Sequence, residues 1–455
     1  MSDTDDGWLF VGPESDDYEC SQSYAPGGLC PVKLGDLIGP GTPSRYRIIF
    51  KLGFGSFSTV WLAHDSVESR NVALKIVQAK STARSQELDV LERLRALDST
   101  AGQEPYVIQL LDSFEHTSPN GIHQVLVTEP VVPLLAPYSP YSEFQPRVTK
   151  DVLRQTIEGL AYIHSRGVAH GDLYPANFGI AVPEIHRFEE LEFWHQATYP
   201  PLRPVIPFPP HCDPHSYPPY LCGKLDLGEF LGLRAPDIIG RPLSVRIFDF
   251  GGAYVVDGSA PPRPVAPPFY AAPEVLFPQV ILNKEDPLWD QRSDIWSLGV
   301  AFHDLVGAGG HFPELLFDDT LLPHYMVCIC GEVPDAWRDH IDSQPSPLGR
   351  SCLAPDITEK FWDGRKKLFA QRGVEDASGL VGLMRRMLVL DPAKRPSAQE
   401  LLDDPYFSCS NGTRNVVGNI HPLMRLPTSI PHGEEADFQT NSANLLTFGS
   451  TSRLL

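Results

Sequence analysis

The segment HGDLYPANF, residues 170–178, contains the residues on which the interpretation of the whole chain depends. Asp172 and Asn177 stand five positions apart, directly after a stretch with the apolar periodicity of a helix, residues 152–167. Phosphoryl transfer needs a group that positions the attacking hydroxyl, and it needs oxygen ligands for a divalent cation. Asp172 suits the first role and Asn177 suits the second. A simple turn is the commoner use of either residue taken alone, and it stays the alternative.

A second acidic residue of the same kind follows further along the chain. Asp249 comes at the end of a predicted strand, in the segment IFDFGG, residues 247–252. Its carboxylate would add a further oxygen ligand for Mg²⁺. The three polar residues together therefore predict a site for phosphoryl transfer.

A glycine-rich segment, LGFGSFSTV at residues 52–60, lies between two predicted strands. Gly53 and Gly55 would allow the backbone to approach a chain of phosphates without steric conflict from a Cβ atom. Such a hairpin often serves only as a turn, so this segment by itself is weak evidence for a nucleotide site.

Lys75 stands in the apolar strand VALKIV, residues 72–77. An ammonium group among buried neighbours needs an anionic partner, because an unpaired buried charge is costly. Glu87, in the helix predicted next, shares one helical face with Leu91 and Leu94. The sequence therefore favours a Lys75–Glu87 ion pair over a Lys at a strand edge and a solvated Glu.

The chain divides into a strand-rich part and a helix-rich part. Short β-rich runs fill residues 46–132, and helical periodicity dominates after about residue 150. This order predicts an α+β protein with a β-rich N-lobe and a helical C-lobe. We expect an acidic disordered tail at 1–23, an N-lobe with an N-terminal extension at 24–132, a C-lobe at 133–407 with a proline-rich insert at about 181–243, and an irregular tail at 408–455.

Composition limits the partners and the location. No run of about 18 apolar residues occurs, so we expect no membrane partner. The net charge of −20 argues against direct binding to nucleic acid. Eight cysteines in 455 residues, with no signal-peptide pattern at the start, indicate reduced thiols and a cytoplasmic or nuclear protein.

Taken in chain order, the motifs resemble those of protein kinases: GFGSFSTV, VALK, Glu87, HGDLYPAN, DFG, APE and SDIWSLG. The resemblance is closest to the SR-protein kinases and their fungal relatives. It rests on PVKLGDLI (31–38), KLGFGSFSTVWLA (51–63), VIQLLDSFEHTSPNGIH (107–123) and the long insert before Asp249. The likeness covers about residues 24–407 and implies a two-lobed protein-kinase-like fold.

The resemblance also implies an activity, ATP- and Mg²⁺-dependent phosphorylation of Ser or Thr in a protein substrate, Arg/Ser-rich in this family. It implies Asp172 as the catalytic base, Lys75 on the α- and β-phosphates with Glu87 as its partner, and Asn177 and Asp249 as Mg²⁺ ligands. The residues that would surround the nucleotide are Leu52, Gly53, Gly55, Ser58, Val60, Ala73, Lys75, Thr128, Glu129 and Val131, with Thr128 as gatekeeper and Glu129 and Val131 in the hinge.

Two structural roles are implied as well. Glu274 of the APE motif would form an ion pair with Arg395, and Asp294 would brace the catalytic loop from a core helix.

Four positions depart from the family pattern. Gly171 replaces the Arg that receives a phosphorylated activation-segment residue, so we expect no regulation of that type. Tyr174 replaces the Lys that contacts the transferring phosphate, and Pro267 replaces the Thr that bonds to this Lys. Ala271 replaces an Arg beside the P+1 loop, which puts the substrate preference of the family in question for this chain. We expect a slow but active kinase; the alternatives are a nucleotide-binding pseudokinase scaffold and a small-molecule kinase with an HGDxxPxN loop.

The proline-rich insert could also recruit a partner. Pro201, Pro204, Pro207 and Pro210 recur at every third residue, with Arg203 nearby, as a polyproline II ligand of a proline-recognition domain requires. The alternative is a stiff, irregular spacer that lies on the C-lobe.

Overall fold

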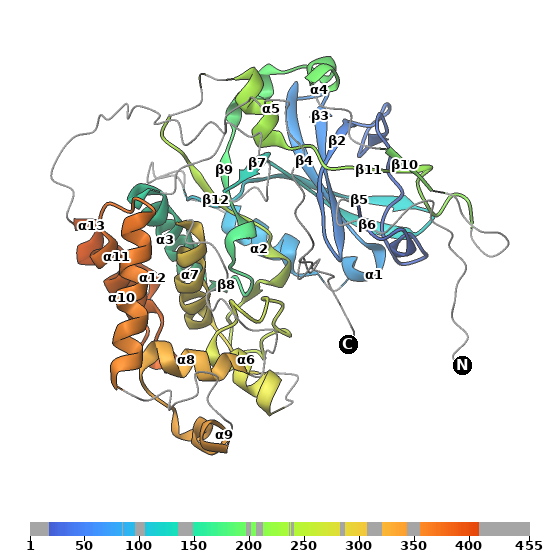
Figure 1. Cartoon of the computed structure of the whole chain (residues 1–455). Helices are drawn as coiled ribbons and strands as arrows, with labels where there is room; N and C mark the ends of the chain where they lie inside the picture. The colour runs from blue at the N-terminus through green and yellow to red at the C-terminus, as the bar shows by residue number, and fades with distance from the viewer. Residues whose placement is uncertain are drawn as a thin grey trace, which may run out of the picture. The chain divides into compact units, whose positions relative to one another are not determined.

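The computed structural model describes residues 18–83, 85–95, 105–134, 149–196, 202–205, 213–235, 237, 241–282, 287–306, 321–343 and 355–408. Figure 1 shows the chain and the labels of its elements. The chain forms two units, Met1–Ser410 and Asn411–Leu455, and all described residues belong to the first. Most of the expected N-terminal tail and nearly all of the expected C-terminal tail lie outside the described residues.

The N-lobe is built on a six-stranded antiparallel sheet of order β1-β2-β3-β4-β6-β5. Its strands are β1 (Leu37–Ile38), β2 (Tyr46–Phe54), β3 (Ser58–Asp65), β4 (Arg70–Val77), β5 (Leu110–Ser118) and β6 (Gly121–Thr128). β-Branched and aromatic residues are frequent in these strands, as a half-buried pleated surface requires. The predicted β-rich lobe is confirmed.

Both faces of this sheet are covered. Trp61, Leu74 and Val127 contribute to an apolar cluster on one face. Residues on the other face, among them Leu62, join the main core together with α2 (Glu87–Arg95), which buries Val90, Leu91 and Leu94. A short helix, α1 (Ala79–Thr82), follows β4 and packs against β6.

The C-lobe is helical, as predicted. Its elements are α3 (Lys150–Ser165), α6 (Pro273–Leu276), α7 (Gln291–Leu305), α8 (Leu322–Cys330), α9 (Arg338–Ser343), α10 (Pro355–Gln371), α11 (Ala377–Met387), α12 (Ala398–Leu402) and α13 (Pro405–Ser408). Helix α7 is buried on nearly every side, which is the pattern of a core helix. In the described ranges, no helix combines the length and the apolar character needed to cross a bilayer.

Short strands hold the loops between the lobes. The strands β12 (Val245–Ile247), β9 (Phe178–Ala181) and β7 (Val131–Pro133) form a three-stranded sheet in that order. A second pair joins β8 (Val168–Ala169) to β13 (Tyr254–Val255). These pairings place residues 170–177 and residues 248–253 side by side, because each segment follows or precedes one of the paired strands.

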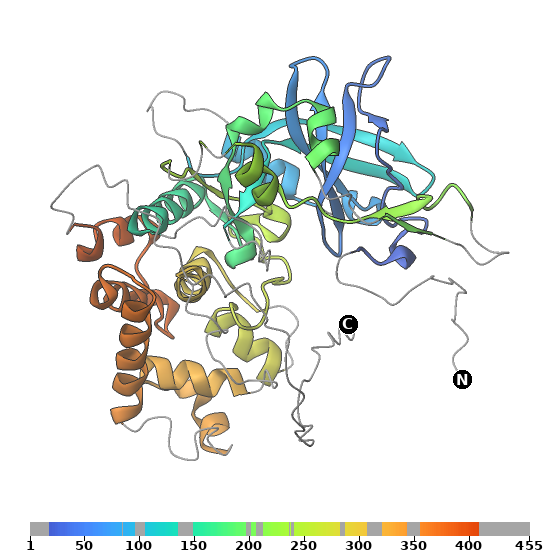
Figure 2. The same cartoon turned by 45° about the horizontal axis from the view of Figure 1, so that its top comes forward.

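The insert forms regular structure that the sequence did not indicate. It contains α4 (Glu190–Gln196), the hairpin of β10 (Leu202–Pro204) and β11 (Tyr220–Cys222), and α5 (Leu227–Arg234). The hairpin lies beside the strands of the N-lobe sheet (Figure 1; Figure 2).

Contacts along the insert fix this position. Asn71 of β4 donates to the carbonyl oxygens of Ile185 and Phe188, and Trp194 packs at a tilt against Phe50 with ring centroids 4.7 Å apart. The expectation of an irregular spacer on the C-lobe is therefore wrong, because the described part of the insert contacts the N-lobe.

Two residues of the predicted polyproline II ligand, Arg203 and Pro204, have partners within the protein. Pro204 lies in β10 and pairs with Tyr220 of β11, and the Arg203 guanidinium lies 4.6 Å from the ring centroid of Tyr18. These two residues are engaged within the protein. Pro201, Pro207 and Pro210 lie outside the described residues.

Candidate active site

Four residues expected at the nucleotide lie on one face of the N-lobe sheet. Val60 pairs with Lys75 across β3 and β4, and Ala73 pairs with Thr128 across β4 and β6. Directly paired residues share a face, and so do residues two apart in one strand. Val60, Ala73, Lys75 and Thr128 therefore form one continuous strip.

The glycine-rich turn joins β2 to β3. The Gly55 N–H donates to the carbonyl oxygen of Ser58 at 2.9 Å, which closes the turn. A Cβ atom added at Gly53 or Gly55 would meet nothing within 4 Å among the described atoms. The packing of the protein itself thus does not require glycine here, and the open backbone suits close approach by a ligand. Leu52 and Ser58 flank this turn at the ends of β2 and β3.

The segment after β6 connects the lobes. The Glu129 carboxylate accepts hydrogen bonds from Arg246 Nε at 2.7 Å and from the Gln109 N–H at 3.0 Å. Val131 begins β7 and pairs with Ala181 of β9. The expected hinge is thereby tied by its side chain to β12 and by its backbone to β9.

Lys75 is at the centre of a charge network. Its Nζ atom lies 2.7 Å from Glu87 Oε1 and 2.7 Å from Asp249 Oδ1. Burial alone would lower the pKa of Lys75, but Asp249 and Glu87 together raise it above its ordinary value, so the ammonium stays charged. The predicted Lys75–Glu87 pair is present, and Asp249 joins it from the other lobe.

Asp249 adopts a left-handed backbone conformation with φ 64° and ψ 76°. This conformation is uncommon for a residue with a side chain and is often found at functional sites. Its Oδ1 atom also accepts a long bond from the Gly251 N–H at 3.4 Å. The ammonium of Lys75 is the main cause that lowers the pKa of Asp249, so the carboxylate is ionised at neutral pH.

Asp172 and Asn177 face each other across the catalytic loop. Asn177 Nδ2 donates to the Asp172 carbonyl oxygen at 2.8 Å and to Asp172 Oδ2 at 3.2 Å. Asp172 Oδ1 is buried and has no hydrogen-bond partner within the described part of the chain. Burial, followed by the charge of Asp249, raises the pKa of Asp172 to about 7. An oxygen so oriented is free to accept a proton from a hydroxyl group.

Asp294 braces the catalytic loop from α7, as the family resemblance implied. Its Oδ2 atom accepts from the His170 N–H at 2.8 Å and its Oδ1 atom accepts from the Gly171 N–H at 2.8 Å. His164 Nε2 lies 2.9 Å from the same carboxylate. The side chain of Asp294 is almost fully buried, so these bonds are shielded from water.

Gly171 makes room for a tryptophan. Its φ angle is 74°, and an added Cβ would lie 2.3 Å from Cη2 of Trp289 and 2.9 Å from the Gly252 carbonyl oxygen. Trp289 Nε1 donates to the carbonyl oxygen of Pro262 at 2.9 Å, and the Tyr254 hydroxyl donates to the Trp289 carbonyl oxygen at 2.6 Å. The indole thus connects the catalytic loop to the activation segment in the place where the family pattern has an arginine.

Tyr174 packs against Tyr270, with ring centroids 5.7 Å apart. The Tyr270 hydroxyl donates to Asp304 Oδ2 at 2.5 Å. Burial, with Asp172 and Asp249, raises the pKa of Tyr174, so its phenol stays protonated. The Pro267 carbonyl accepts from the N–H groups of Tyr270 and Ala271, which closes a turn directly before the APE motif.

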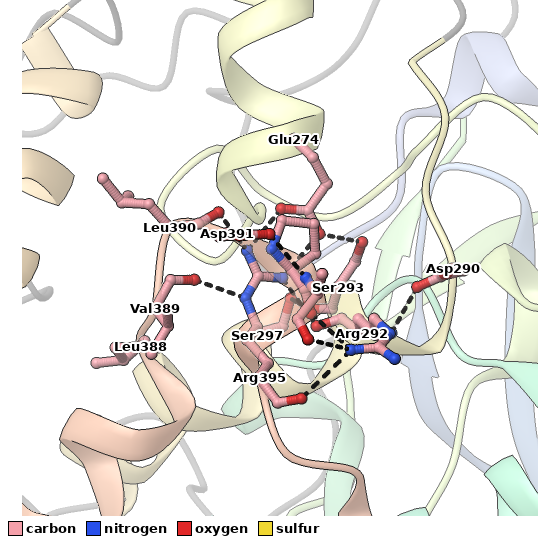
Figure 3. A network of polar contacts seen from close by, with 12 residues as sticks. Glu274, Asp290, Arg292, Ser293, Ser297, Leu388, Val389, Leu390, Asp391 and Arg395 are labelled. Carbon is pink, nitrogen blue, oxygen red and sulfur yellow. Dashed lines mark hydrogen bonds and ion pairs between the residues drawn. The ribbon is translucent and has the colours of Figure 1, made fainter. Parts of the chain in front are cut away.

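Below the activation segment, Arg395 organises a buried polar network (Figure 3). Its guanidinium binds both oxygens of Glu274, at 2.8 and 2.7 Å. It also donates to the carbonyl oxygens of Arg292, Val389 and Leu390, and its side chain is fully buried. The expected Glu274–Arg395 ion pair is therefore present, and Ser293 adds a bond to Glu274 at 2.6 Å.

Sequence reasoning missed some of the residues that shape this site. Trp289 carries no sequence signal for its role, because only the folded chain brings it to Gly171. His164 lies at the end of α3 and was not singled out. Ser293 stands next to Asp294, and its bond to Glu274 depends on the position of α6 relative to α7.

Comparisons with known proteins agree with this geometry. The family model described as the protein kinase domain matches residues 46–184 and 238–407. A serine/threonine protein kinase of Aspergillus fumigatus is 30% identical over 397 residues, covering 83% of this chain and 87% of that protein. The serine/threonine-protein kinase SRPK of Physarum polycephalum is 28% identical over 442 residues, covering 89% and 93%.

A solved structure of a kinase domain is similar in fold, with a TM-score of 0.50 at 18% identity, covering 83% of this chain and 98% of that one. The family match spans both lobes and omits most of the insert. The chain therefore belongs to the protein kinase family, and it is a serine/threonine protein kinase similar to the SR-protein kinases.

Proposed function

We propose that this chain transfers the γ-phosphoryl group of ATP to Ser or Thr residues of Arg/Ser-rich proteins. The observation that carries this proposal is the assembled centre: Lys75 bonds to Glu87 and Asp249 at the same time, and Asp172 presents a buried oxygen to which no described residue donates a hydrogen bond. A scaffold has no need to keep both features. The substrate class rests on the similarity to SR-protein kinases, and the acidic net charge of −20 is compatible with a basic substrate.

The residues near Asp249 fit a magnesium ion. Mg²⁺ prefers oxygen ligands, and the site offers the Asp249 carboxylate and the Oδ1 atom of Asn177, whose Nδ2 atom is turned toward Asp172. Asn177 and Asp249 would hold the ion. Bound there, it would offset the negative charge of the phosphates.

The remaining roles follow from the positions of the side chains. Lys75, held by Glu87, would bind the α- and β-phosphates, and the strip of Val60, Ala73 and Thr128 would contact the adenine. The substrate hydroxyl would donate its proton to Asp172 Oδ1 while its oxygen attacks the γ-phosphorus. The bond from this phosphorus to the bridging oxygen of ADP would break, and Asp172 would end the step protonated.

The test of this proposal is nucleotide binding with and without Mg²⁺. A ligand at 100 times its Kd stabilises a folded protein by about 2.7 kcal/mol. For a domain of this size we expect the melting temperature to rise by roughly 5–10 °C when ATP and Mg²⁺ are added. The shift should shrink with EDTA and in Asp249→Ala. Wild type as unresponsive as Asp249→Ala at millimolar ATP would contradict the proposal.

We also expect activity without phosphorylation of the activation segment. Between Asp249 and Glu274 the hydroxyl residues are Tyr254, Ser259 and Tyr270. Both tyrosines are buried and hydrogen-bonded, so Ser259 is the exposed one. Phosphatase-treated protein and Ser259→Ala should keep most of the wild-type rate.

Trp289→Ala provides the contrast for that experiment. It removes the indole that joins Gly171 to Pro262, and the rate should fall while ATP binding stays. A large loss after dephosphorylation of correctly folded protein would refute phosphorylation-independent activity.

The rate should be low because Tyr174 stands in place of a lysine. One preorganised group that stabilises developing charge is worth roughly 10²–10³ in rate at comparable sites. The pair Tyr174→Lys with Pro267→Thr should recover part of this factor, since it restores both halves of a contact that the family pattern contains. The measurement is the steady-state rate on an Arg/Ser-repeat peptide, with Tyr174→Leu as the uncharged control for the lost ring contact. A double variant no faster than wild type would show that Tyr174 does not limit the rate.

A further inference from the structure

Beyond β1, the outer edge of β2 is completed by two segments, one just before β1 and one in the insert. β1 pairs with Tyr46 and Arg47 at the start of β2, and the edge beyond them is bonded by other segments. Ile48 exchanges backbone hydrogen bonds with residues 35 and 36. Further along, the Lys51 carbonyl accepts from the Leu225 N–H of the insert at 2.8 Å, and Lys51 forms a parallel bridge with Lys224.

The insert meets β2 where its own ladder is irregular. The register between β2 and β3 shifts between Lys51 and Gly53, directly before the glycine-rich turn. The bond from Leu225 therefore supports the backbone at the point where pairing with β3 is interrupted. A displacement of the insert at this point would move the start of the turn.

Lys224 reaches the turn itself. Its ammonium lies 4.8 Å from the ring centroid of Phe54, the residue between Gly53 and Gly55. Lys224 is exposed, whereas its neighbours Cys222 and Leu225 are buried in apolar clusters. The backbone at Lys224 is thus anchored on both sides, and its side chain holds the ring by a cation–π contact.

The N-terminal extension also contacts this part of β2, through Lys51. Lys51 is buried, pairs with the Glu19 carboxylate and lies 4.7 Å from the ring centroid of Trp61. The Tyr24 hydroxyl donates to the same carboxylate at 2.6 Å. Tyr24 packs in one apolar cluster with Leu29 of the extension and with three residues of the insert, Val205, Tyr217 and Leu221.

We propose that residues 220–225 of the insert position the glycine-rich turn and thereby set the affinity for ATP, with Lys224 as the positioning residue. The inference rests on the proposed function, since it requires a nucleotide beneath this turn. The insert would thus control the affinity for ATP. A partner protein that binds the insert and displaces it would change this affinity through Phe54 and Lys51.

The test measures the Kd of ATP with Mg²⁺ for Lys224→Gln, with Lys33→Gln as the matched control. Lys33 is a second exposed lysine on the N-lobe, and it pairs with Asp36 instead of an aromatic ring. Loss of an exposed cation–π contact should weaken ATP binding by about two- to five-fold in Lys224→Gln. The control should bind as wild type does, and the KM for peptide should be unchanged in both.

A double-mutant cycle separates positioning from simple charge attraction. If Lys224 acts through the Phe54 ring, Lys224→Gln should have no further effect in a Phe54→Leu background. An equal effect in both backgrounds would assign the change to long-range charge and overturn the inference. If wild type binds ATP and Lys224→Gln binds it equally well, the inference fails and the proposed function stands; if wild type binds no ATP, both fail.

Discussion

The Asp172→Asn variant should bind ATP with Mg²⁺ as wild type does and transfer almost no phosphate. Asn cannot accept the proton of the substrate hydroxyl, and general-base catalysis is worth roughly 10²- to 10⁴-fold. The Asn177 bonds to residue 172 can be kept, because an amide oxygen still accepts. The measurement is the single-turnover rate at saturating ATP, paired with the Kd of ATP. Equal rates for the two proteins would remove Asp172 from the mechanism.

The same variant should be more stable than wild type at alkaline pH. The folded-state pKa of Asp172 is raised to about 7, so the folded protein favours the protonated carboxyl. Stability is therefore lost as pH rises from the unfolded value near 4 to the folded value near 7. Asp172→Asn removes this loss, and its melting temperature in the absence of ATP should exceed that of wild type by about 2–6 °C at pH 8. The difference should shrink toward pH 5.

Arg395→Ala should strongly destabilise the C-lobe core. It removes the guanidinium from three carbonyl oxygens and from the Glu274 carboxylate, which keeps its bond from Ser293. Removing one partner of a buried ion pair costs about 3–5 kcal/mol. The melting temperature should fall by roughly 6–20 °C in a protein of this size.

Two further variants test whether the loss of stability comes from the buried ion pair between Arg395 and Glu274. Arg395→Lys keeps the charge but not the two-pronged geometry, so it should be intermediate. Arg385→Ala breaks an exposed pair with Glu359 and should change melting little, as surface pairs do. Equal melting temperatures for Arg395→Ala and Arg385→Ala would show that the network in Figure 3 does not carry the stability assigned to it.

The sequence predicted the strands that carry the site because they are locally encoded. Alternating and β-branched residues fix β2, β3 and β4, and Lys75 is detectable because it is a charge in an apolar strand. Its pairing with Glu87 follows from its need for an anion and from the helical spacing that places Glu87 on the same face as Leu91 and Leu94. The link from Lys75 to Asp249 does not, because it joins residues 174 positions apart through the approach of two lobes.

The insert shows where such reasoning fails. Prolines disfavour helix and central strand, so the sequence predicted an irregular segment, whereas residues 202–204 form a short strand of a hairpin. The proline pattern also gives no indication of what this hairpin contacts. Its position depends on the N-terminal extension and on the unpaired edge of β2, and neither feature is visible in a local pattern. Trp289 was missed for the same reason: Gly171 was interpreted as a lost arginine, whereas the fold uses the space for an indole.

The most direct test of the account is transfer of labelled phosphate from ATP to an Arg/Ser-repeat peptide by purified protein. Wild type should label serine slowly, in proportion to time and to enzyme. The label should require Mg²⁺ and should disappear in Asp172→Asn. If wild type binds ATP but labels neither this peptide nor other basic and neutral protein substrates above the level of Asp172→Asn, the chain is a nucleotide-binding scaffold and the account of its catalytic centre is wrong.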